Sequence, residues 1–421
     1  MKKLLIIYPN WLPSNAVGVQ RVRLIVNFLH EYGWTPELVT VHSDYYEEEV
    51  SEDLKLLVDS SFKVHFVSAQ PPKRHLRFYG DITLRAWHPL KQKSLELLKS
   101  GNFDAFWVPI PPFYTAVMAR QLFDKIKVPY GIDYIDPWVH EFPGNKKWDL
   151  VRAKLSTWIA KLLEPYAVKN ISFLTGVAEA YFIDVINRNR HLLNVPKVSM
   201  PYGFNPNDYQ IKVNAPSFFG NSKQSVSDTY VYAGAFLPKS HDFIQILFKC
   251  LSILLQEKYI NDTTHFLFVG TGSSKLKSIN EYARDAGISH IVTEIKERIS
   301  YLEVIKCLSL AKGVLAIGST ESHYTASKIF QSILSNKPVF PVFHKESSVV
   351  EILQKARANQ YLVQYDASID SFKFEEILMN QLKSYLLLQQ GWEPDLSALN
   401  EYSAKASAKL LASILDVVVR K

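Results

Sequence analysis

The chain has 421 residues, of which 47% are hydrophobic, and a formal net charge of +7 at pH 7. This length exceeds one ordinary core and indicates two domains of roughly 200 residues, each able to bury a sizeable core. No segment reaches the roughly 18 consecutive apolar residues of a membrane span, and the apolar run before Tyr8 is too short for a signal peptide. No nucleic-acid-binding motif accompanies the charge, so we expect no nucleic-acid partner; anionic lipids or acidic substrates explain the charge as well.

The first half alternates strands and helices. A strand at 3–8 leads through a loop to a helix at 19–32, which Gly33 ends. Gly18 stands alone in that loop without a GxGxxG motif, so a dinucleotide cofactor is poorly supported. A long amphipathic helix is expected at 150–170. Further strands are expected at 37–41, 62–67, 103–109, 130–133 and 171–175.

The segment 71–99 is basic and aromatic, with seven Lys or Arg against two acidic residues and with Phe78, Tyr79 and Trp87 interleaved. Such a surface element could rest on lipid headgroups or on a lipid-linked acceptor. The alternative is a solvated pair of helices whose aromatic side chains belong to the core.

A strand in the stretch GIDYIDPWVHEF ends in acidic residues, and Pro137 with Trp138 then breaks it. Asp136 is therefore expected at the carboxyl edge of the strand, which faces the ligand in a doubly wound fold. The alternative is that Asp136 caps the following turn. His140 lies four residues later, where a surface or structural role is equally open.

Proline and glycine at Pro201, Gly203 and Pro206 close the first half, and the polar stretch 206–228 indicates a linker or surface loop. The pattern then restarts with a strand at 230–233, a helix at 243–255 and a strand at 265–269. That strand runs into Gly270 and Gly272, a turn suited to close approach of a ligand to the backbone. The predicted domains are 1–205 and 229–395, joined by 206–228 and followed by 396–421, whose helix at 404–418 can pack back on the first domain.

The stretch 313–342 predicts a strand, a polar loop, a helix and a strand. Thr325 or Ser327 can cap the helix, and Asn336 with Pro338 can end it. At such a site the helix N-terminus favours an anion, and Lys328 would add a full positive charge. We interpret the site as a binding site for a diphosphate. The alternative is that Lys328 is a solvated lysine in the first turn of a helix.

Two cysteines, Cys250 and Cys307, lie far apart in apolar runs, and no CxxC or Cys/His spacing is present. We expect buried reduced thiols rather than a disulfide or a metal site, as is typical of a cytoplasmic protein.

Four segments together resemble GT-B glycosyltransferases, specifically the nucleotide-sugar-dependent family-4 group, and the resemblance covers nearly the whole chain. They are IDPWVHEF, PYGFNPNDY, YVYAGAF and SKIFQSILSNKPVF, in the order and spacing of that family. The resemblance implies an α/β fold with two Rossmann-like, doubly wound domains that face each other across a cleft.

The resemblance also implies a site. Where the family commonly has two glutamates, this chain has His323 and Gln331, with Glu321 two residues upstream of the first. Gln331 can still hydrogen-bond ribose hydroxyls, whereas His323 cannot copy a carboxylate's charge. The implied catalytic residues are Asp136, His140 and Glu321. The implied donor-binding residues are Gly234, Lys239, Gly270, Gly272, His323, Ser327, Lys328 and Gln331, and Gly18, Arg21 and Trp138 line the acceptor side.

The implied activity is transfer of a sugar from a nucleotide-diphosphate donor to a saccharide or lipid-linked acceptor, in cell-surface polysaccharide, lipopolysaccharide or glycolipid synthesis. The family implies retention of anomeric configuration, with the leaving phosphate accepting the acceptor's proton. We expect no cofactor and no metal, because no DxD-like segment stands at a suitable loop, and a cytoplasmic protein at the inner face of the membrane. The alternatives are a catalytically silent GT-B scaffold that binds a sugar nucleotide or a protein partner, and a sugar-nucleotide epimerase of the same fold.

Overall fold

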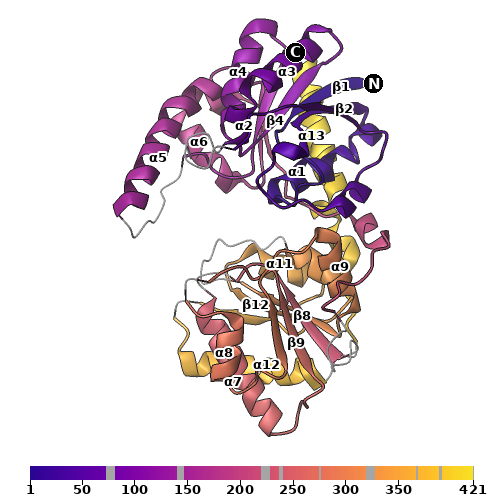
Figure 1. The fold of residues 1–421 in the computed structure, drawn as a ribbon, viewed down its shortest axis with the longest axis vertical. Coiled ribbons are helices and arrows are strands. Elements are labelled where there is room, and N and C mark those ends of the chain that lie inside the picture. Colours follow the sequence, from indigo (N-terminus) through magenta and orange to yellow (C-terminus); the bar gives the residue numbers. More distant parts are fainter. Residues whose placement is uncertain are drawn as a thin grey trace. The chain divides into compact units, whose positions relative to one another are not determined.

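The computed structural model describes residues 1–72, 81–139, 147–219, 228–236, 240–274, 276–318, 328–366, 368–387 and 391–420, with the backbone alone at 147–150 and 152. The chain divides into two compact units (Figure 1). The first unit comprises Met1–Asn205 and Tyr402–Lys421, and the second comprises Pro206–Glu401. Each unit contains one parallel sheet with helices packed on it, so the expected fold class of two Rossmann-like units is confirmed.

The first unit has a seven-stranded sheet in the order β3-β2-β1-β4-β5-β6-β7, and every pairing is parallel. The central strands are buried apolar runs because helices cover both faces of such a sheet. Successive strands are added on one side of β1 and then on the other, so the order reverses between β1 and β4. The strands are β1 (Lys2–Ile7), β2 (Trp34–Val41), β3 (Lys63–Val67), β4 (Ala105–Ile110), β5 (Tyr130–Tyr134), β6 (Phe173–Gly176) and β7 (Lys197–Ser199).

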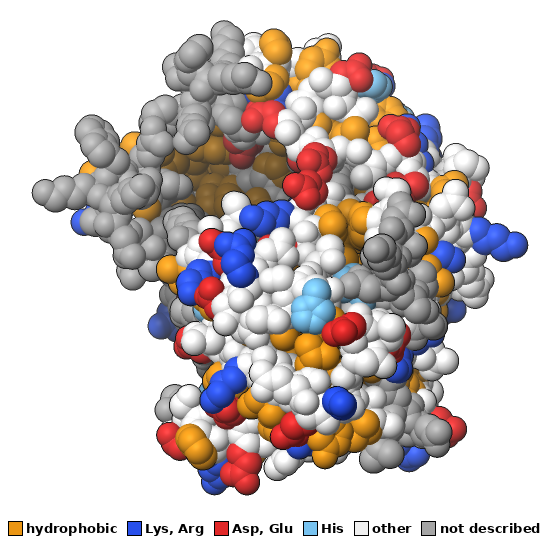
Figure 2. Space-filling model, turned by 60° about the horizontal axis from the view of Figure 1, so that its bottom comes forward, with side chains coloured by type: hydrophobic (Ala, Val, Ile, Leu, Met, Phe, Trp, Pro, Cys, Tyr) orange, Lys and Arg blue, Asp and Glu red, His pale blue; other side chains and the backbone are white. Residues whose placement is uncertain are grey.

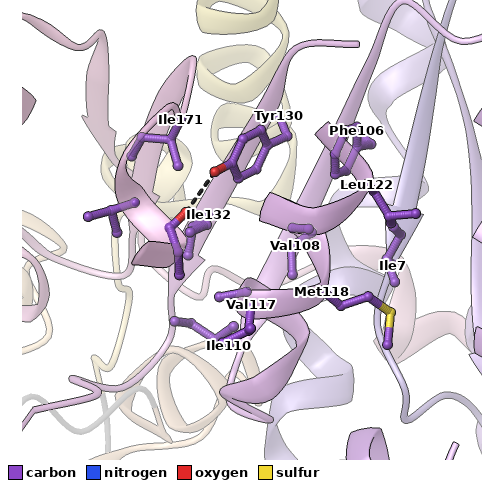
Figure 3. Packing of buried hydrophobic residues seen from close by; sticks show 14 of the residues in the cluster. Ile7, Phe106, Val108, Ile110, Val117, Met118, Leu122, Tyr130, Ile132 and Ile171 are labelled. Atoms are coloured by element: carbon purple, nitrogen blue, oxygen red, sulfur yellow. Dashed lines mark hydrogen bonds between the residues drawn. The ribbon is translucent and has the colours of Figure 1, made fainter. Parts of the chain in front are cut away.

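Apolar side chains from these strands and from the covering helices form the core of the first unit (Figure 3). Tyr130 stacks on Phe106 with ring centroids 5.3 Å apart. Its hydroxyl donates a 2.6 Å hydrogen bond to the Ala167 carbonyl of α5, which ties that helix to the sheet. The helices are α1 (Val17–Val26), α2 (Ile82–Arg85), α3 (Trp87–Lys99), α4 (Tyr114–Ile126), α5 (Lys147–Val168), α6 (Ile183–Arg188) and α13 (Ala404–Val419).

The last helix, α13, belongs to the first unit although it follows the second in sequence. Ser403 caps its start by accepting a 3.2 Å hydrogen bond from the Ala406 N–H. Near its end, Asp416 pairs with Lys2 at 2.7 Å and accepts from the Trp34 indole at 3.0 Å. These contacts join the end of the chain to its first two strands.

The second unit has a six-stranded parallel sheet in the order β10-β9-β8-β11-β12-β13. The strand order therefore reverses between β8 and β11, as it does between β1 and β4. The strands are β8 (Thr229–Ala233), β9 (His265–Val269), β10 (Val292–Ile295), β11 (Gly313–Ile317), β12 (Val339–His344) and β13 (Val363–Tyr365). The helices are α7 (His241–Gln256), α8 (Ile279–Asp285), α9 (Tyr301–Leu310), α10 (Lys328–Leu334), α11 (Ser348–Lys355) and α12 (Ser371–Leu387).

Two details differ from the sequence prediction. The helix expected at 19–32 is interrupted: α1 ends at Val26, Asn27 donates to the Leu57 carbonyl at 2.9 Å, and a separate 3-10 turn follows at Leu29–Tyr32. The edge strands β7, β10 and β13 were not predicted. Gly33 and Asn336 do adopt the left-handed backbone expected of them, with φ of 82° and 55°.

Candidate functional site

The strand order places a candidate site in each unit. In open α/β sheets, ligands bind outside the carboxyl ends of the strands where the strand order reverses. In the second unit this point lies between β8 and β11, and in the first between β1 and β4.

In the second unit, Gly234 and Lys328 come together at this reversal. Gly234 directly follows β8, and Lys328 is the first residue of α10, the helix that follows β11. The backbone of Gly234 has a φ of 144°, and a Cβ at this position would overlap the Lys328 ammonium. Only glycine leaves room for the lysine here. Two residues predicted to bind the donor are therefore in direct contact.

The Lys328 ammonium lies in a desolvated position. Burial, with a smaller contribution from the positive charge of Arg298, lowers the pKa of Lys328 to about 8. The ammonium lies 5.7 Å from the centroid of the Tyr232 ring. Among the described residues, the structure gives Lys328 no ion pair with a carboxylate. A desolvated cation of this kind is suited to an anionic ligand.

The loop after β8 is fixed across the reversal by Ser240. Its buried hydroxyl donates a 2.7 Å hydrogen bond to the carbonyl of Gly318, directly after β11. Ser240 directly precedes α7, and its side chain makes no capping hydrogen bond there. The bond instead joins the residue before α7 to the residue after β11.

The turn after β9 lies beside the loop after β8. Gly270 and Gly272 have φ of 70° and 74°, a conformation that favours glycine, and a Cβ at either position would meet nothing within 4 Å. Their neighbour Thr271 donates to Glu294 at 2.7 Å, and its carbonyl accepts from the Phe236 N–H at 2.9 Å. The loops after β8 and β9 therefore lie side by side.

Gln331 lies three residues beyond Lys328 and so neighbours it on the surface of α10. Its backbone carbonyl accepts a hydrogen bond of 2.5 Å from the hydroxyl of Tyr209, which belongs to the 3-10 turn Pro206–Gln210. The start of the predicted linker thus packs on the second unit and holds the helix of the candidate site.

His241, which the sequence did not single out, stands beside these loops. Its Nδ1 and the Tyr282 hydroxyl are 2.9 Å apart, and its ring lies 4.4 Å from that of Phe236. Burial lowers the pKa of this imidazole, so it stays neutral at pH 7. Five predicted site residues lie outside the described part of the chain: His140, Lys239, Glu321, His323 and Ser327.

In the first unit, a pocket of about 400 Å³ lies at the corresponding reversal. The ends of β1, β4 and β5 contribute Tyr8, Pro112 and Asp136, and α1 contributes Gly18. A Cβ at Gly18 would overlap the Tyr8 hydroxyl, so the glycine lets this ring pack against the helix. Gly18 and Asp136 therefore line one pocket. The full lining is Tyr8, Asn10, Ala16, Val17, Gly18, Glu48, Pro111, Pro112, Ile135, Asp136, Tyr181 and Tyr202.

The polar groups of this pocket are hydroxyls, an amide and two carboxylates, with no lysine or arginine in its lining. Glu48, which the sequence did not reveal, accepts hydrogen bonds from Asn10 at 2.6 Å and Ser14 at 2.7 Å. Burial raises the pKa values of Tyr8 and Tyr202, and the negative charge of the exposed Asp136 adds to this shift. These hydroxyls therefore remain neutral hydrogen-bonding groups at physiological pH.

The expected cleft position of Arg21 is wrong. Arg21 is fully buried and forms a two-pronged ion pair with Asp133, with both N–O distances at 2.8 Å. A third nitrogen donates to the carbonyls of Met200 and Pro201 at 2.6 and 2.9 Å. All three nitrogens of its guanidinium therefore have hydrogen-bond acceptors inside the unit. Trp138 is also buried and does not line the pocket; its ring stacks on Phe113 with centroids 5.6 Å apart.

In the described part of segment 71–99, one basic side chain is used inside the unit, whereas Lys91 and Lys93 are half-buried and Lys99 is exposed. Arg85 is buried and donates to the carbonyls of Gln70 and Tyr45 at 2.9 and 3.0 Å. Trp87 packs against the core of the first unit. Phe78, Tyr79 and three of the basic residues lie outside the described part. On the face shown in Figure 2, basic and acidic side chains are interspersed.

No helix among the described residues is long and apolar enough to span a membrane. They contain no group of three or more His, Cys, Asp or Glu side chains that could hold a metal ion. Cys250 and Cys307 are buried free thiols, as predicted, and burial raises the pKa of each to about 12.

Solved structures resemble this chain over its whole length, whereas no protein-family model and no curated protein matches it. The Anabaena protein Alr3699/HepE in complex with UDP is 15% identical with a TM-score of 0.59, covering 99% of this chain and 100% of its own. An Escherichia coli trehalose-6-phosphate structure bound with UDP-2-fluoro glucose is 10% identical with a TM-score of 0.57, covering 98% and 99%. A Listeria monocytogenes protein described as a UDP-N-acetylglucosamine 2-epimerase is 11% identical with a TM-score of 0.56, covering 100% and 98%. At these identities the likeness establishes the fold.

Proposed function

We propose that this protein is a glycosyltransferase that moves a sugar from a nucleotide-diphosphate donor to a saccharide or lipid-linked acceptor. The observation that carries the proposal is the Lys328 ammonium, desolvated against Gly234 at the strand-order reversal of the second unit. A cation in this place, at the start of a helix, suits a diphosphate. Structures of the same fold contain UDP or a UDP-sugar, which favours a nucleotide sugar as the ligand.

The residues of the second unit then divide the work of donor binding. Lys328 and the first N–H groups of α10 stabilise the negative charge that builds up on the departing diphosphate. The left-handed turn at Gly270 and Gly272 lets the backbone approach the donor. Gln331, on the same helix as Lys328, would hydrogen-bond the ribose. We further propose that no metal takes part and that the reaction retains the anomeric configuration, as the family-4 resemblance implies.

The pocket of the first unit suits the acceptor. Its neutral tyrosine hydroxyls, the Asn10 amide and two carboxylates match the hydroxyl groups of a sugar, and its lining holds no cation that would favour a phosphate. Asp136 is placed to orient the acceptor hydroxyl or to receive its proton. Transfer in cell-surface glycan or glycolipid synthesis, on the cytoplasmic side of the membrane, agrees with such an acceptor.

A thermal-melting panel of UDP, GDP, dTDP, ADP and their common sugars tests donor binding. A ligand at about 100 times its dissociation constant adds roughly 2.7 kcal/mol of stability. We expect one nucleotide to stabilise the wild type and to fail on Lys328→Met. Lys249→Met is the matched control, because Lys249 is an exposed lysine of the same unit, paired with Glu375. If no nucleotide stabilises the wild type at millimolar concentration, the proposal is wrong and a silent scaffold is favoured.

Nucleotide release from the donor found in this way, measured with a panel of neutral sugar acceptors, then tests transfer. We expect Asp136→Asn to lower kcat while the melting shift with donor is unchanged. The Listeria epimerase structure favours a second candidate, a sugar-nucleotide epimerase. That enzyme would convert its donor into an isomeric sugar nucleotide in the absence of any acceptor, without releasing the nucleotide. Proton NMR of the donor, followed in parallel with nucleotide release, distinguishes the two activities.

A further inference from the structure

Helix α5 of the first unit carries an exposed apolar stripe. The stripe consists of Val151, Leu155, Trp158, Leu162 and Tyr166. Their exposed fractions are 59%, 40%, 59%, 56% and 39%. Their spacing of three or four residues places them on one face along the whole helix. Large apolar side chains gathered in this way indicate an interaction surface.

The stripe does not hold the helix in place, because the opposite face does. Ala160, Ala167 and Val168 lie on that face and belong to the core of the first unit. The Tyr130 hydroxyl donates to the Ala167 carbonyl, and a dashed line at Tyr130 in Figure 3 marks this bond among the core side chains. Figure 1 shows α5 running along the outside of the first unit. The helix is thus apolar on two faces, and the fold uses one of them.

The charges beside the stripe are positive. Lys154 and Lys161 are exposed, and at 100° per residue both lie on the same flank of the stripe. Lys169 is exposed just beyond the end of the helix. The one acidic side chain described on α5, Glu164, is buried and forms a two-pronged pair with Arg188, with both distances at 2.9 Å. It therefore contributes no negative charge to the exposed face.

We propose that the α5 stripe docks on a lipid bilayer that contains anionic lipids. Its apolar side chains would enter the boundary between headgroups and acyl chains, while the lysines neutralise lipid phosphates. Trp158 and Tyr166 are the aromatic types that favour this interface. A second copy of the chain is a poorer occupant, since pairing two such helices would bring basic flanks together without acidic partners.

This surface differs from the segment 71–99, where Arg85 and Trp87 are used inside the unit. It is also independent of the proposed donor chemistry, because docking needs neither nucleotide nor acceptor. For a lipid-linked acceptor, docking would hold the first unit at the surface where that acceptor resides.

Co-sedimentation of the whole chain with vesicles tests the proposal. Pure phosphatidylcholine vesicles and vesicles of equal parts phosphatidylcholine and phosphatidylglycerol serve as the two probes. We expect stronger binding to the mixed vesicles, weakened by salt. Trp158→Gln/Leu162→Gln should lower this binding more than ten-fold. Lys154→Gln/Lys161→Gln should lower it roughly 30-fold, from about 1 kcal/mol per lysine.

Phe372→Gln is the control for the apolar change, since Phe372 is 81% exposed on α12 of the second unit. It should bind vesicles as the wild type does. Thermal melting should be unchanged in all three variants, because every altered side chain is exposed. The proposal is overturned if the wild type ignores mixed vesicles or if the stripe variant binds them equally well. If the wild type is a dimer that does not bind vesicles, and the stripe variant is a monomer, the occupant of the stripe is a second copy of the chain.

Discussion

The two units use a buried or desolvated cation in opposite ways. Arg21 of the first unit lies on α1, the helix that follows β1, and Lys328 of the second lies on α10, the helix that follows β11. Arg21 is fully buried, paired with Asp133 and bonded to two carbonyls. Lys328 faces the ring of Tyr232 and the backbone of Gly234, with no ion pair among the described residues.

The presence or absence of an ion-pair partner distinguishes a cation that stabilises the fold from one that is suited to bind a ligand. A buried cation whose donors are all satisfied stabilises one arrangement of the chain and has nothing left for a ligand. A desolvated cation without such a partner lowers the stability of the free protein and becomes favourable when an anion binds. On this comparison, the pocket of the first unit is lined by neutral hydroxyls and carboxylates, whereas the candidate site of the second unit contains a positive charge.

The largest effect is expected when the structural cation is removed. Arg21→Met leaves Asp133 buried without its partner, which should lower the free energy of unfolding by about 3–5 kcal/mol. Urea unfolding followed by tryptophan fluorescence measures this loss. The double variant Arg21→Met/Asp133→Leu should recover much of the stability. A single variant that loses less than about 1 kcal/mol would contradict the structural role.

Removal of the second cation should act on ligand binding instead. Lys328→Met should abolish the roughly 2.7 kcal/mol by which a nucleotide at 100 times its dissociation constant stabilises the wild type. The ligand-free variant should be more stable, by on the order of 1 kcal/mol, because a desolvated charge is gone. Thermal melting with and without ligand measures both. A variant that loses stability and keeps its nucleotide shift would show that Lys328 is structural, like Arg21.

The close contact between Gly234 and Lys328 gives an intermediate effect. Gly234→Ala puts a Cβ where the ammonium lies and strains a backbone with φ of 144°, which should cost about 1–3 kcal/mol and displace the lysine. Gly287→Ala is the matched control: its φ is 73° and a Cβ would meet nothing within 4 Å. The control should lose about 1 kcal/mol and still bind nucleotide, as isothermal titration can measure. Equal nucleotide binding by both variants would count against the proposed diphosphate-binding site.

The sequence predicted the sheets well because their strands are short buried apolar runs between turn residues. The prediction for 265–269 matches β9 to the residue. Local sequence also shows Lys328 near the start of a helix that follows a strand. Its grouping with Gly234 in one site was implied by the family resemblance. Local sequence does not show β7, a three-residue edge strand with half-exposed side chains.

Roles that depend on distant residues could not be predicted. Arg21 was expected in the cleft, and its ion pair with Asp133 could not be foreseen because the two residues lie 112 positions apart in the sequence. Ser240 resembles a helix cap, yet its partner Gly318 lies 78 positions away. Glu48 lies at the first pocket because its segment pairs with the loop after β1, through a bridge between Ser14 and Val50. The local sequence pattern does not reveal this pairing.

The smallest effect, and the one most specific to Lys328, is a dependence on pH. Burial and Arg298 place the pKa of Lys328 at about 8, and Tyr232 is the aromatic group beside it. The lysine is mostly charged at pH 7 and mostly neutral at pH 9, so the affinity for the nucleotide found in the melting panel should fall roughly ten-fold across this range. Lys328→Arg, whose charge persists, should show no such fall. Because the folded pKa lies below that of an unfolded lysine, the unfolded chain binds more protons between about pH 8 and 10.5, and the stability of the ligand-free wild type should rise across that window. Isothermal titration and urea unfolding at several pH values measure the two effects; an affinity that falls equally in Lys328→Arg would assign the titration to another group.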